Sequence, residues 1–517
     1  MTSTRQEVRL AEVIASLALA TDLATGQPLE HGLRRTLLAI WLGEEMGIDS
    51  VELSTTFYVA LLGSVGCILD GAAFADYVRD EIDLRREMVM LDGSKSLQVA
   101  AFFLRKTGEG DAPFRRLRKF LTVSRQSESV CRDVALHVGG LLDLGPVVRG
   151  ALGQCDEHWN GTGSGLGLKG EDIHLAARLF ILCHDVEVFS RAGGVEAAMA
   201  VVKDRSGRVY DPRIAERFLA VGGALIERLQ SVSAWEAVLE AEPEPVRRLS
   251  SPEFDDVARK IANFVDVRCP HTLGHSTGVA YFAEGAARAL DLGDSEVMQI
   301  RQAGLLHDLG RAGVAASLWN KKGPLNDEEW GRMKRHPSLT ELVLARSTSL
   351  GHLGTLAGLH HEKLDGSGYR GLTASSLPVA ARILAVADTY QGKLEPRPHR
   401  AALSPEEAVG EVRQEGERGL LDPDVVDAVL SVAGHQRVAP SRALPAGLSE
   451  REAEVLRLVV RGMSNRQIAD SLVLSPKTVG HHIESIYAKI GVSTRVGATL
   501  FAVQHGLAAG DYTPSSE

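Results

Sequence analysis

The feature that most constrains the fold of this chain is an internal repeat, in which anchor residues of the first half recur at equal spacing in the second half. Asp22 stands nine positions before His31, and Asp266 stands nine positions before His275. In both copies the next anchor follows the histidine by 32 positions. Equal spacing across several anchors indicates a tandem duplication. The two copies are therefore expected to share one fold.

Both copies are predicted to be helical. In the second copy Val257, Ile261 and Phe264 recur with the 3.6-residue period of an amphipathic helix. No strand-like alternation of useful length is found, so the predicted fold class is all-α. The proline-containing segments 240–252 and 436–445 indicate a linker after each copy.

The composition is that of a soluble globular protein. The length of 517 residues allows about two to four domains, and 57 Lys and Arg against 67 Asp and Glu give a net charge of −10. This charge argues against nonspecific nucleic-acid binding by the whole molecule, but not against DNA binding by one small domain. Five cysteines without a CxxC pair, and no evident signal peptide or membrane span, predict a cytoplasmic location and no membrane partner.

The second copy carries side chains that are typical metal ligands. In chain order they are His275, His307, Asp308, His336, His360, His361 and Asp388. Imidazole and carboxylate groups suit transition metals, and Asp308 beside His307 is placed to bridge two ions. Seven ligands suit a dinuclear site, which can lower the pKa of water for attack on a phosphoester.

The doublets His307-Asp308 and His360-His361, with the segment Asp365-Gly366-Ser367-Gly368-Tyr369, resemble the HD-GYP branch of the HD phosphohydrolases. Characterised members of that branch hydrolyse cyclic di-GMP. The resemblance implies a dinuclear divalent metal site, with Fe or Mn bound, and a cyclic dinucleotide or related phosphoester as ligand. It also implies catalytic roles for Asp308 and for Arg311.

The second copy also departs from the family pattern. Arg311 stands where the family usually carries lysine, and it retains the charge that clamps a phosphate but cannot donate a proton near neutral pH. His271 replaces the carboxylate of a third metal, Arg370 replaces the proline of the Gly-Tyr-Pro signature, and Gln391 replaces a carboxylate. These changes affect substrate contacts more than metal ligands.

The first copy has lost most of these ligands. Gly63-Ser64 replaces the His-Asp doublet, Cys155-Asp156 replaces the His-His doublet, and Cys131 and His184 align with His336 and Asp388. Of the ligand set only His31 is retained, so no hydrolysis is expected here. Its cysteines are interpreted either as core residues that fill an emptied cavity or as a sensor pocket for zinc or redox change. The first interpretation is favoured because no ligand-spaced cysteine pair is present.

The segment 448–507 resembles the four-helix helix-turn-helix domain of LuxR-type transcription regulators. Ser449 and Glu452 form a predicted capping box, 465–471 is a predicted supporting helix, and Ser475-Pro476 is expected to begin the recognition helix. The candidate DNA-binding residues are Lys477, Thr478, His481, His482, Lys489 and Arg495. Residues 446–517 hold seven basic and seven acidic side chains, so a homodimer is expected to supply enough contact area.

The predicted architecture is therefore two HD-like helical domains, residues 1–240 and 250–435, followed by a four-helix helix-turn-helix domain, residues 446–512. The favoured function is a cytoplasmic transcription regulator that couples DNA binding to a metal-binding domain, which senses or hydrolyses a cyclic dinucleotide or related phosphoester. The alternative function is primarily that of a metal-dependent phosphodiesterase of the cyclic di-GMP class, with an accessory DNA-binding domain.

Overall fold

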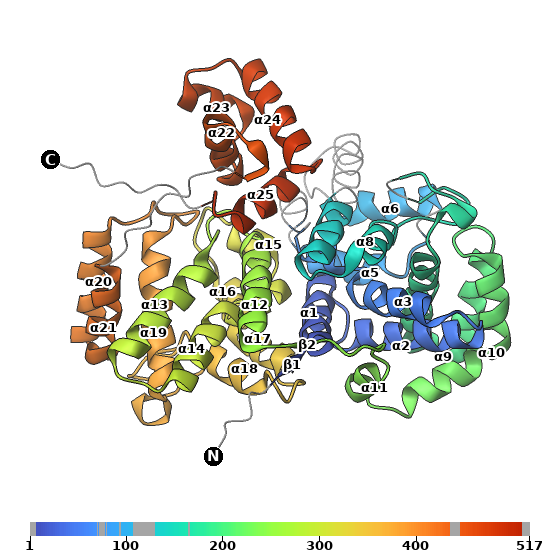
Figure 1. Cartoon of the computed structure of the whole chain (residues 1–517), viewed down its shortest axis with the longest axis horizontal. Coiled ribbons are helices and arrows are strands. Elements are labelled where there is room, and N and C mark those ends of the chain that lie inside the picture. The colour runs from blue at the N-terminus through green and yellow to red at the C-terminus, as the bar shows by residue number, and fades with distance from the viewer. Residues whose placement is uncertain are drawn as a thin grey trace. The chain divides into compact units, whose positions relative to one another are not determined.

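The computed structural model describes residues 7–69, 71, 78, 80–92, 95–106, 130–163, 166–434 and 445–508 (Figure 1). The linker predicted at 436–445 lies outside these residues except for its last position. The chain forms two compact units: Met1–Phe254 with Ala315–Ser317, and Asp255–Val314 with Leu318–Glu517. The prediction of an all-α fold is confirmed, because the named strands of the described part are β1 (Val8–Arg9) and β2 (Arg248–Leu249), which pair antiparallel.

The helices of the first unit are consecutive segments of the first copy. They are α1 (Leu10–Thr25), α2 (His31–Glu45), α3 (Ser50–Leu62), η1 (Val65–Ile68), α5 (Glu81–Met88), α6 (Ser96–Lys106), α8 (Gly145–Leu152), η2 (Gly170–Asp172), α9 (Leu175–Arg205), α10 (Pro212–Gln230) and α11 (Ala234–Glu240). Helix α2 is the centre of the bundle, because α1, α3, α9, α10 and α11 all pack against it. Helix α9 bends at Gly193 and Gly194, whose backbone angles leave the helical region.

The second copy begins with α12 (Ser251–Asp266) and repeats this order. The following segments are α13 (His275–Ala289), α14 (Asp294–Leu306), η3 (Leu309–Gly313), α15 (Ala316–Trp319), α16 (Asp327–Met333), α17 (His336–Leu344), α18 (Gly351–Ala357), η4 (Ala374–Ser376), α19 (Val379–Leu394), α20 (Pro405–Glu417) and α21 (Pro423–Ala433). Helix α13 is central here, with α14, α19 and α21 against it, as α3, α9 and α10 lie against α2. The predicted helical faces are confirmed, since Val257, Ile261 and Phe264 are buried.

Matched contacts confirm the tandem duplication. Asp22 accepts a hydrogen bond from the backbone N–H ten positions later, at 3.0 Å, and Asp266 does the same at 2.9 Å. Glu30 and Gly274, which precede the first histidine of each copy, both have a left-handed backbone, with φ of 74° and 76°. The left-handed geometry is therefore retained even where glycine has been lost.

One long apolar segment of the first copy is a core element. Ser50–Ile68 is long and apolar enough to cross a membrane by length and composition alone. It consists of α3 and η1, separated by Gly63 and Ser64, and 56% of its most apolar window is buried inside the protein. Burial of this kind is what the core helix of a helical bundle requires.

In each copy, one glycine lets two segments of the backbone approach each other closely. A Cβ atom at Gly310 would lie 2.1 Å from the carbonyl oxygen of His336, and one at Gly66 would lie 2.3 Å from the carbonyl oxygen of Cys131. Both glycines belong to the short turn after the third helix of their copy. The approach places this turn directly on the segment that supplies the next candidate site residue.

We expect Gly310→Ala to destabilise the protein, because the added methyl group collides with backbone that cannot rotate away. Overpacking of this kind costs about 1–3 kcal/mol. The measurement is thermal unfolding of the full chain, with Gly331→Ala as control, since a Cβ at Gly331 meets nothing within 4 Å. Equal unfolding temperatures for the two variants would contradict the close approach.

Candidate metal centre and nucleic-acid interface

The second copy brings all seven predicted ligand residues together, most of them from the ends of its helices. His275 and His336 begin α13 and α17, His307 ends α14, and Asp388 lies within α19. Asp308 precedes η3, and His360 and His361 follow α18. Six of these side chains are buried, and His361 is partly exposed. Helix ends suit this role because they change the chain direction at a fixed point and aim side chains inward.

The ligand atoms form two groups, His336 with His360 and His361, and His275 with His307 and Asp308. Within each group they lie within 4.8 Å of one another. Two carboxylates connect the groups. Asp308 Oδ1 is 3.4 Å from His336 Nε2 and Asp308 Oδ2 is 3.4 Å from His307 Nε2, while Asp388 is 3.0 Å from His275 and 3.3 Å from His361. Carboxylates in such positions can each face two cations.

Three of the histidines are fixed in one tautomer by their own backbone. Nδ1–H of His307, His336 and His360 donates to the carbonyl oxygen three residues earlier, at 2.8, 2.8 and 2.6 Å. In the neutral ring each Nε2 is then left with a lone pair directed into the site. The buried Nε2 of His307 has no hydrogen-bond partner.

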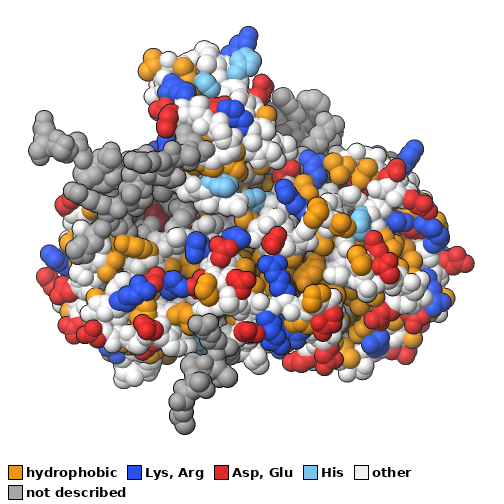
Figure 2. All heavy atoms as spheres, viewed as in Figure 1, with side chains coloured by type: hydrophobic (Ala, Val, Ile, Leu, Met, Phe, Trp, Pro, Cys, Tyr) orange, Lys and Arg blue, Asp and Glu red, His pale blue; other side chains and the backbone are white. Residues whose placement is uncertain are grey.

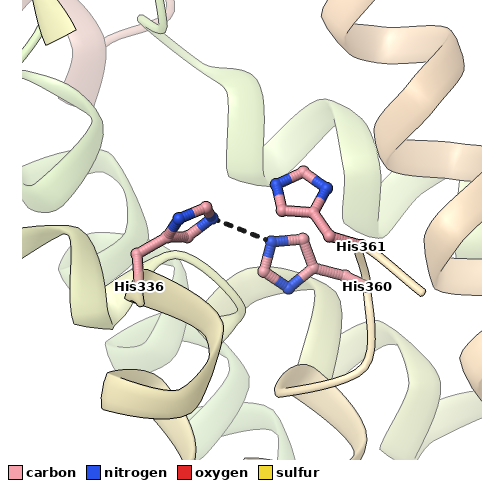
Figure 3. Close-up of side chains that lie close together, drawn as sticks. All are labelled: His336, His360 and His361. Carbon is pink, nitrogen blue, oxygen red and sulfur yellow. Dashed lines mark hydrogen bonds between the residues drawn. The ribbon is translucent and has the colours of Figure 1, made fainter. Parts of the chain in front are cut away.

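The contact between His336 and His360 is the clearest sign that a cation belongs here. Their Nε2 atoms are 3.2 Å apart (Figure 3). Because each ring gives its Nδ1 proton to a carbonyl, two neutral rings would direct lone pairs at one another. A divalent cation removes this repulsion, so the residues present fit a bound metal.

The electrostatics of the site favour metal-binding protonation states for four of its groups, namely three histidines and Asp308. Burial lowers the pKa of His336 to about 3, and it also lowers the pKa values of His360 and His361, so these imidazoles are neutral at neutral pH. Burial acts to raise the pKa of Asp308, but His307 and Arg311 outweigh it and hold that pKa well below its usual value. Metal ligands must be neutral imidazoles and ionised carboxylates, as these four groups are. Burial acts to lower the pKa of His307, but Asp308 outweighs it and raises that pKa above its usual value.

Glu395 supports the site from behind and was not found by the sequence analysis. Its carboxylate lies 3.0 Å from Nδ1 of His275 and accepts a hydrogen bond from Gln391 at 2.7 Å. Burial acts to lower the pKa of His275, but Glu395 and Asp388 together raise that pKa well above its usual value. The carboxylate missing at position 391 is thus supplied one helical turn later, a compensation that spacing alone does not reveal.

The site opens into a cavity of about 940 Å³. The basic residues of its lining are Arg311, Lys321, Lys322, Lys393, Arg397 and Arg400, and its large aromatic residues are Trp319, Trp330 and Tyr369. Arg311 is held at 2.8 Å from Asp308, with its guanidinium 4.0 Å from the ring centre of Trp319. The sequence analysis missed every basic residue here except Arg311, although the clustered charges of 397–400 were a usable signal.

The carboxyl-terminal part of the chain folds as four helices: α22 (Glu450–Val460), α23 (Asn465–Leu472), α24 (Pro476–Ile490) and α25 (Arg495–Gln504). They share one core that includes Val455, Ile468 and Val479. The capping box of Ser449 and Glu452 is present as predicted. Ser475 caps α24, which starts at Pro476, and both were predicted to begin the recognition helix.

Residues 259–425 match the family model described as HD domain, and residues 446–502 match the model described as bacterial regulatory proteins of the luxR family. The chain joins an HD domain to a LuxR-type DNA-binding domain. The HD domain lies in the second copy and contains the ligand cluster, while α24 lies in the LuxR-type domain, at the position where the recognition helix was predicted.

Relatives are known for much of the chain. The 3'3'-cGAMP-specific phosphodiesterase 3 of Vibrio cholerae is 28% identical over 432 residues, which cover 81% of this chain and 94% of that protein. A cyclic di-GMP phosphodiesterase response regulator of Xanthomonas campestris is 35% identical over 174 residues, or 33% of this chain and 46% of that protein. A crystal structure of a cyclic GMP-AMP specific phosphodiesterase from V. cholerae matches with a TM-score of 0.58 and 24% identity, over 83% of this chain and 99% of that one. This structural likeness shows a shared fold.

The candidate DNA-binding residues fall into two classes. Lys477 and His481 are exposed on α24, and Thr478 and His482 are half-exposed beside them. Lys489 instead binds Glu452 at 2.6 Å, where it helps to lower the pKa of that carboxylate to about 2. Arg495 donates to the carbonyl oxygens of Val459 and Met463, at 3.3 and 2.8 Å. Lys489 and Arg495 thus contact other helices of the domain, and their use as DNA contacts stays a prediction.

The first copy has an arginine where the HD domain has its ligand cluster. Arg35 is buried in α2, and its Nη1 donates to Ser64 Oγ at 2.9 Å and lies 3.4 Å from His184 Nδ1. Its guanidinium also donates to the carbonyl oxygen of Ala60 and lies 4.5 Å from the ring centre of Phe180.

The position of Arg35 gives a physical reason why the first copy is not expected to bind a metal. Ser64 and His184 align with Asp308 and Asp388, so the guanidinium lies between the positions of the two bridging carboxylates. A fixed positive charge there repels a metal ion. The expectation that the first copy is not hydrolytic thus has a physical reason that ligand loss alone did not reveal.

We expect the full chain, loaded with Mn or Fe without oxygen, to retain metal, and the double variant His307→Ala, Asp308→Ala to lose it. The variant removes two of the three ligands of one group and the carboxylate that connects this group to His336. The measurement is metal content after desalting. The matched control is Ser64→Ala, which changes the aligned position of the first copy and should leave metal content unchanged. Equal metal content in all three proteins would contradict the assignment of the site.

Proposed function

We propose that this protein is a cytoplasmic transcription regulator whose HD domain hydrolyses or senses a cyclic dinucleotide and whose LuxR-type domain binds DNA in response. We divide the chain into residues 1–240, 250–435 and 446–512 for these roles. The observation that carries the proposal is the ligand cluster at the base of a large basic and aromatic cavity. The cytoplasmic placement is supported by the five free cysteines.

The cavity suits a ligand with two phosphates and two flat bases. Its lining has six Lys and Arg side chains and two carboxylates, Asp308 and Asp388. Lys321 and Lys393 are also paired with Glu329 and Glu411, and Arg400 donates to backbone carbonyl oxygens. Trp330 and Tyr369 pack edge to face with ring centres 5.9 Å apart, and Lys334 lies over both rings. Aromatic faces stack on bases, and cations bind phosphates. The relatives that act on 3'3'-cGAMP or cyclic di-GMP support the same class of substrate.

The residues that would hold the metal are His275, His307, Asp308, His336, His360, His361 and Asp388. When bound, divalent ions supply Lewis acidity, which lowers the pKa of water and offsets charge on phosphate oxygens. We propose two ions, Fe or Mn, because two ligand groups share two carboxylates. Arg311, fixed between Asp308 and Trp319, is positioned to hold a phosphate oxygen at the inner end of the cavity.

For DNA binding we propose Lys477, Thr478, His481 and His482 of α24 as the contact residues. Acidic and basic side chains are interspersed over the surface shown in Figure 2, in keeping with the net charge of −10. A weakly charged domain gains affinity when two copies bind together, so we propose a homodimer on DNA.

One observation favours catalysis as the main activity. The HD domain retains all seven predicted metal-ligand residues in one connected cluster. A domain that only bound a nucleotide as a sensor would not need them all. The alternative is therefore a phosphodiesterase whose LuxR-type domain is accessory. The two functions differ in whether metal or nucleotide changes DNA binding.

The first test is turnover of cyclic di-GMP and 3'3'-cGAMP by the Mn- or Fe-loaded chain. We expect Asp308→Ala to abolish hydrolysis, and Glu395→Gln to reduce it by about 10–100-fold, the usual effect of losing a partner that orients a metal ligand. Binding without hydrolysis, despite retained metal, would identify a sensor. Neither binding nor hydrolysis of either nucleotide would overturn the proposed substrate class.

The second test is DNA binding by the full chain as a function of salt. Loss of one phosphate contact in Lys477→Ala should reduce the slope of log affinity against log salt by about 1. Lys203→Ala, an exposed lysine in the first copy, is the control and should leave the slope unchanged. Identical DNA affinities with and without metal and nucleotide would contradict coupling and favour the accessory role.

A further inference from the structure

The first copy contains a pair of thiols that the proposed function does not use. Cys67 lies in η1, and Cys131 lies in the helical residues 130–141. The two Sγ atoms are 4.0 Å apart although the residues are 64 positions apart in the chain. Both side chains are partly exposed, so small oxidants and reductants can reach them.

The backbone of the fold brings these two cysteines together. Gly66, the neighbour of Cys67, approaches the backbone of Cys131 so closely that an added Cβ would lie 2.5 Å from the Cys131 Cα. The same contact joins Gly310 to His336 in the HD domain, so Cys67 and Cys131 stand at the positions of Arg311 and His336. The thiol pair therefore replaces a cation and a metal ligand, on a backbone that holds the two positions in contact.

The other three cysteines have different surroundings. Cys155 and Cys183 are fully buried, and burial raises the pKa of both thiols, which makes them poor nucleophiles. Cys269 is buried in the HD domain and donates to Asn320 at 3.6 Å. The sensor pocket considered from sequence, with Cys131, Cys155, His31 and His184, is thus not the reactive unit.

We propose that Cys67 and Cys131 form a reversible disulfide when the protein meets a peroxide. One thiolate attacks the peroxide, becomes a sulfenic acid and releases water or hydroxide. The second thiol attacks the sulfenic sulfur, so that the S–S bond forms and a second water leaves. The two thiols lose two electrons in total, and the peroxide is reduced to water. A dithiol reductant returns both thiols by exchange.

Disulfide formation requires the sulfur atoms to close from 4.0 Å to about 2.05 Å, which rotation of both side chains and a small backbone shift can supply. The product ties η1 to residues 130–141, and so it fixes the turn of the first copy that corresponds to η3. This inference does not depend on the substrate or the DNA-binding role of the protein.

The experiment treats the reduced full chain with hydrogen peroxide, blocks the remaining thiols and maps the peptides without reduction. We expect the thiol count under denaturing conditions to fall from the five of the sequence to three, with one peptide pair joined through Cys67 and Cys131. Dithiothreitol should restore all thiols. Cys67→Ser and Cys131→Ser should each prevent the joined pair, while Cys155→Ala should retain it.

A different result would overturn the proposal. The decisive outcomes are an unchanged thiol count at peroxide levels that oxidise a free dithiol, or joined peptides that involve other cysteines or two chains. If a serine variant fails to fold, peptide mapping of the unmodified chain decides the question alone, because it identifies the joined residues directly.

Discussion

The site depends on one interaction, the hydrogen bond from Nδ1–H of a buried histidine to the carbonyl oxygen three residues earlier. It occurs at His307, His336 and His360, and it directs their three Nε2 atoms toward the site. Burial keeps His336 and His360 neutral, so proton uptake does not relieve the repulsion between their lone pairs. A bound cation would relieve this repulsion, and the helix ends around the site place the histidines where they can bind one.

The duplication shows how the same backbone supports two outcomes. Three features recur in both copies. They are a glycine that permits close backbone approach, a left-handed residue before the first histidine, and an aspartate that accepts a hydrogen bond from the backbone ten positions later. In the HD domain the central space is lined by ligands, whereas in the first copy the guanidinium of Arg35 extends into it. A positive charge built into the chain thus lies where a metal would bring its charge.

The cavity beside the ligand cluster is built mainly by segments between and after the ligand helices. Lys321 and Lys322 precede α16, and Arg397 and Arg400 follow α19, so this part of the site can vary while the ligand cluster stays the same. Trp319 and Arg311 connect the two, because the ring lies over the guanidinium that Asp308 holds. The geometry therefore separates metal binding from ligand selection.

Local patterns determined much of this protein from sequence alone: the helical period, the equal spacing of the copies, the ligand-type residues of the HD domain and the capped helices of the LuxR-type domain. These features depend on residues that are close in sequence or on motifs with strict spacing. Only the tertiary structure decided the positions of Glu395, Arg35 and the thiol pair, and the internal contacts of Lys489 and Arg495. Each of these depends on which side chain reaches a given point from a different helix, and side-chain reach in a packed core is not encoded in spacing.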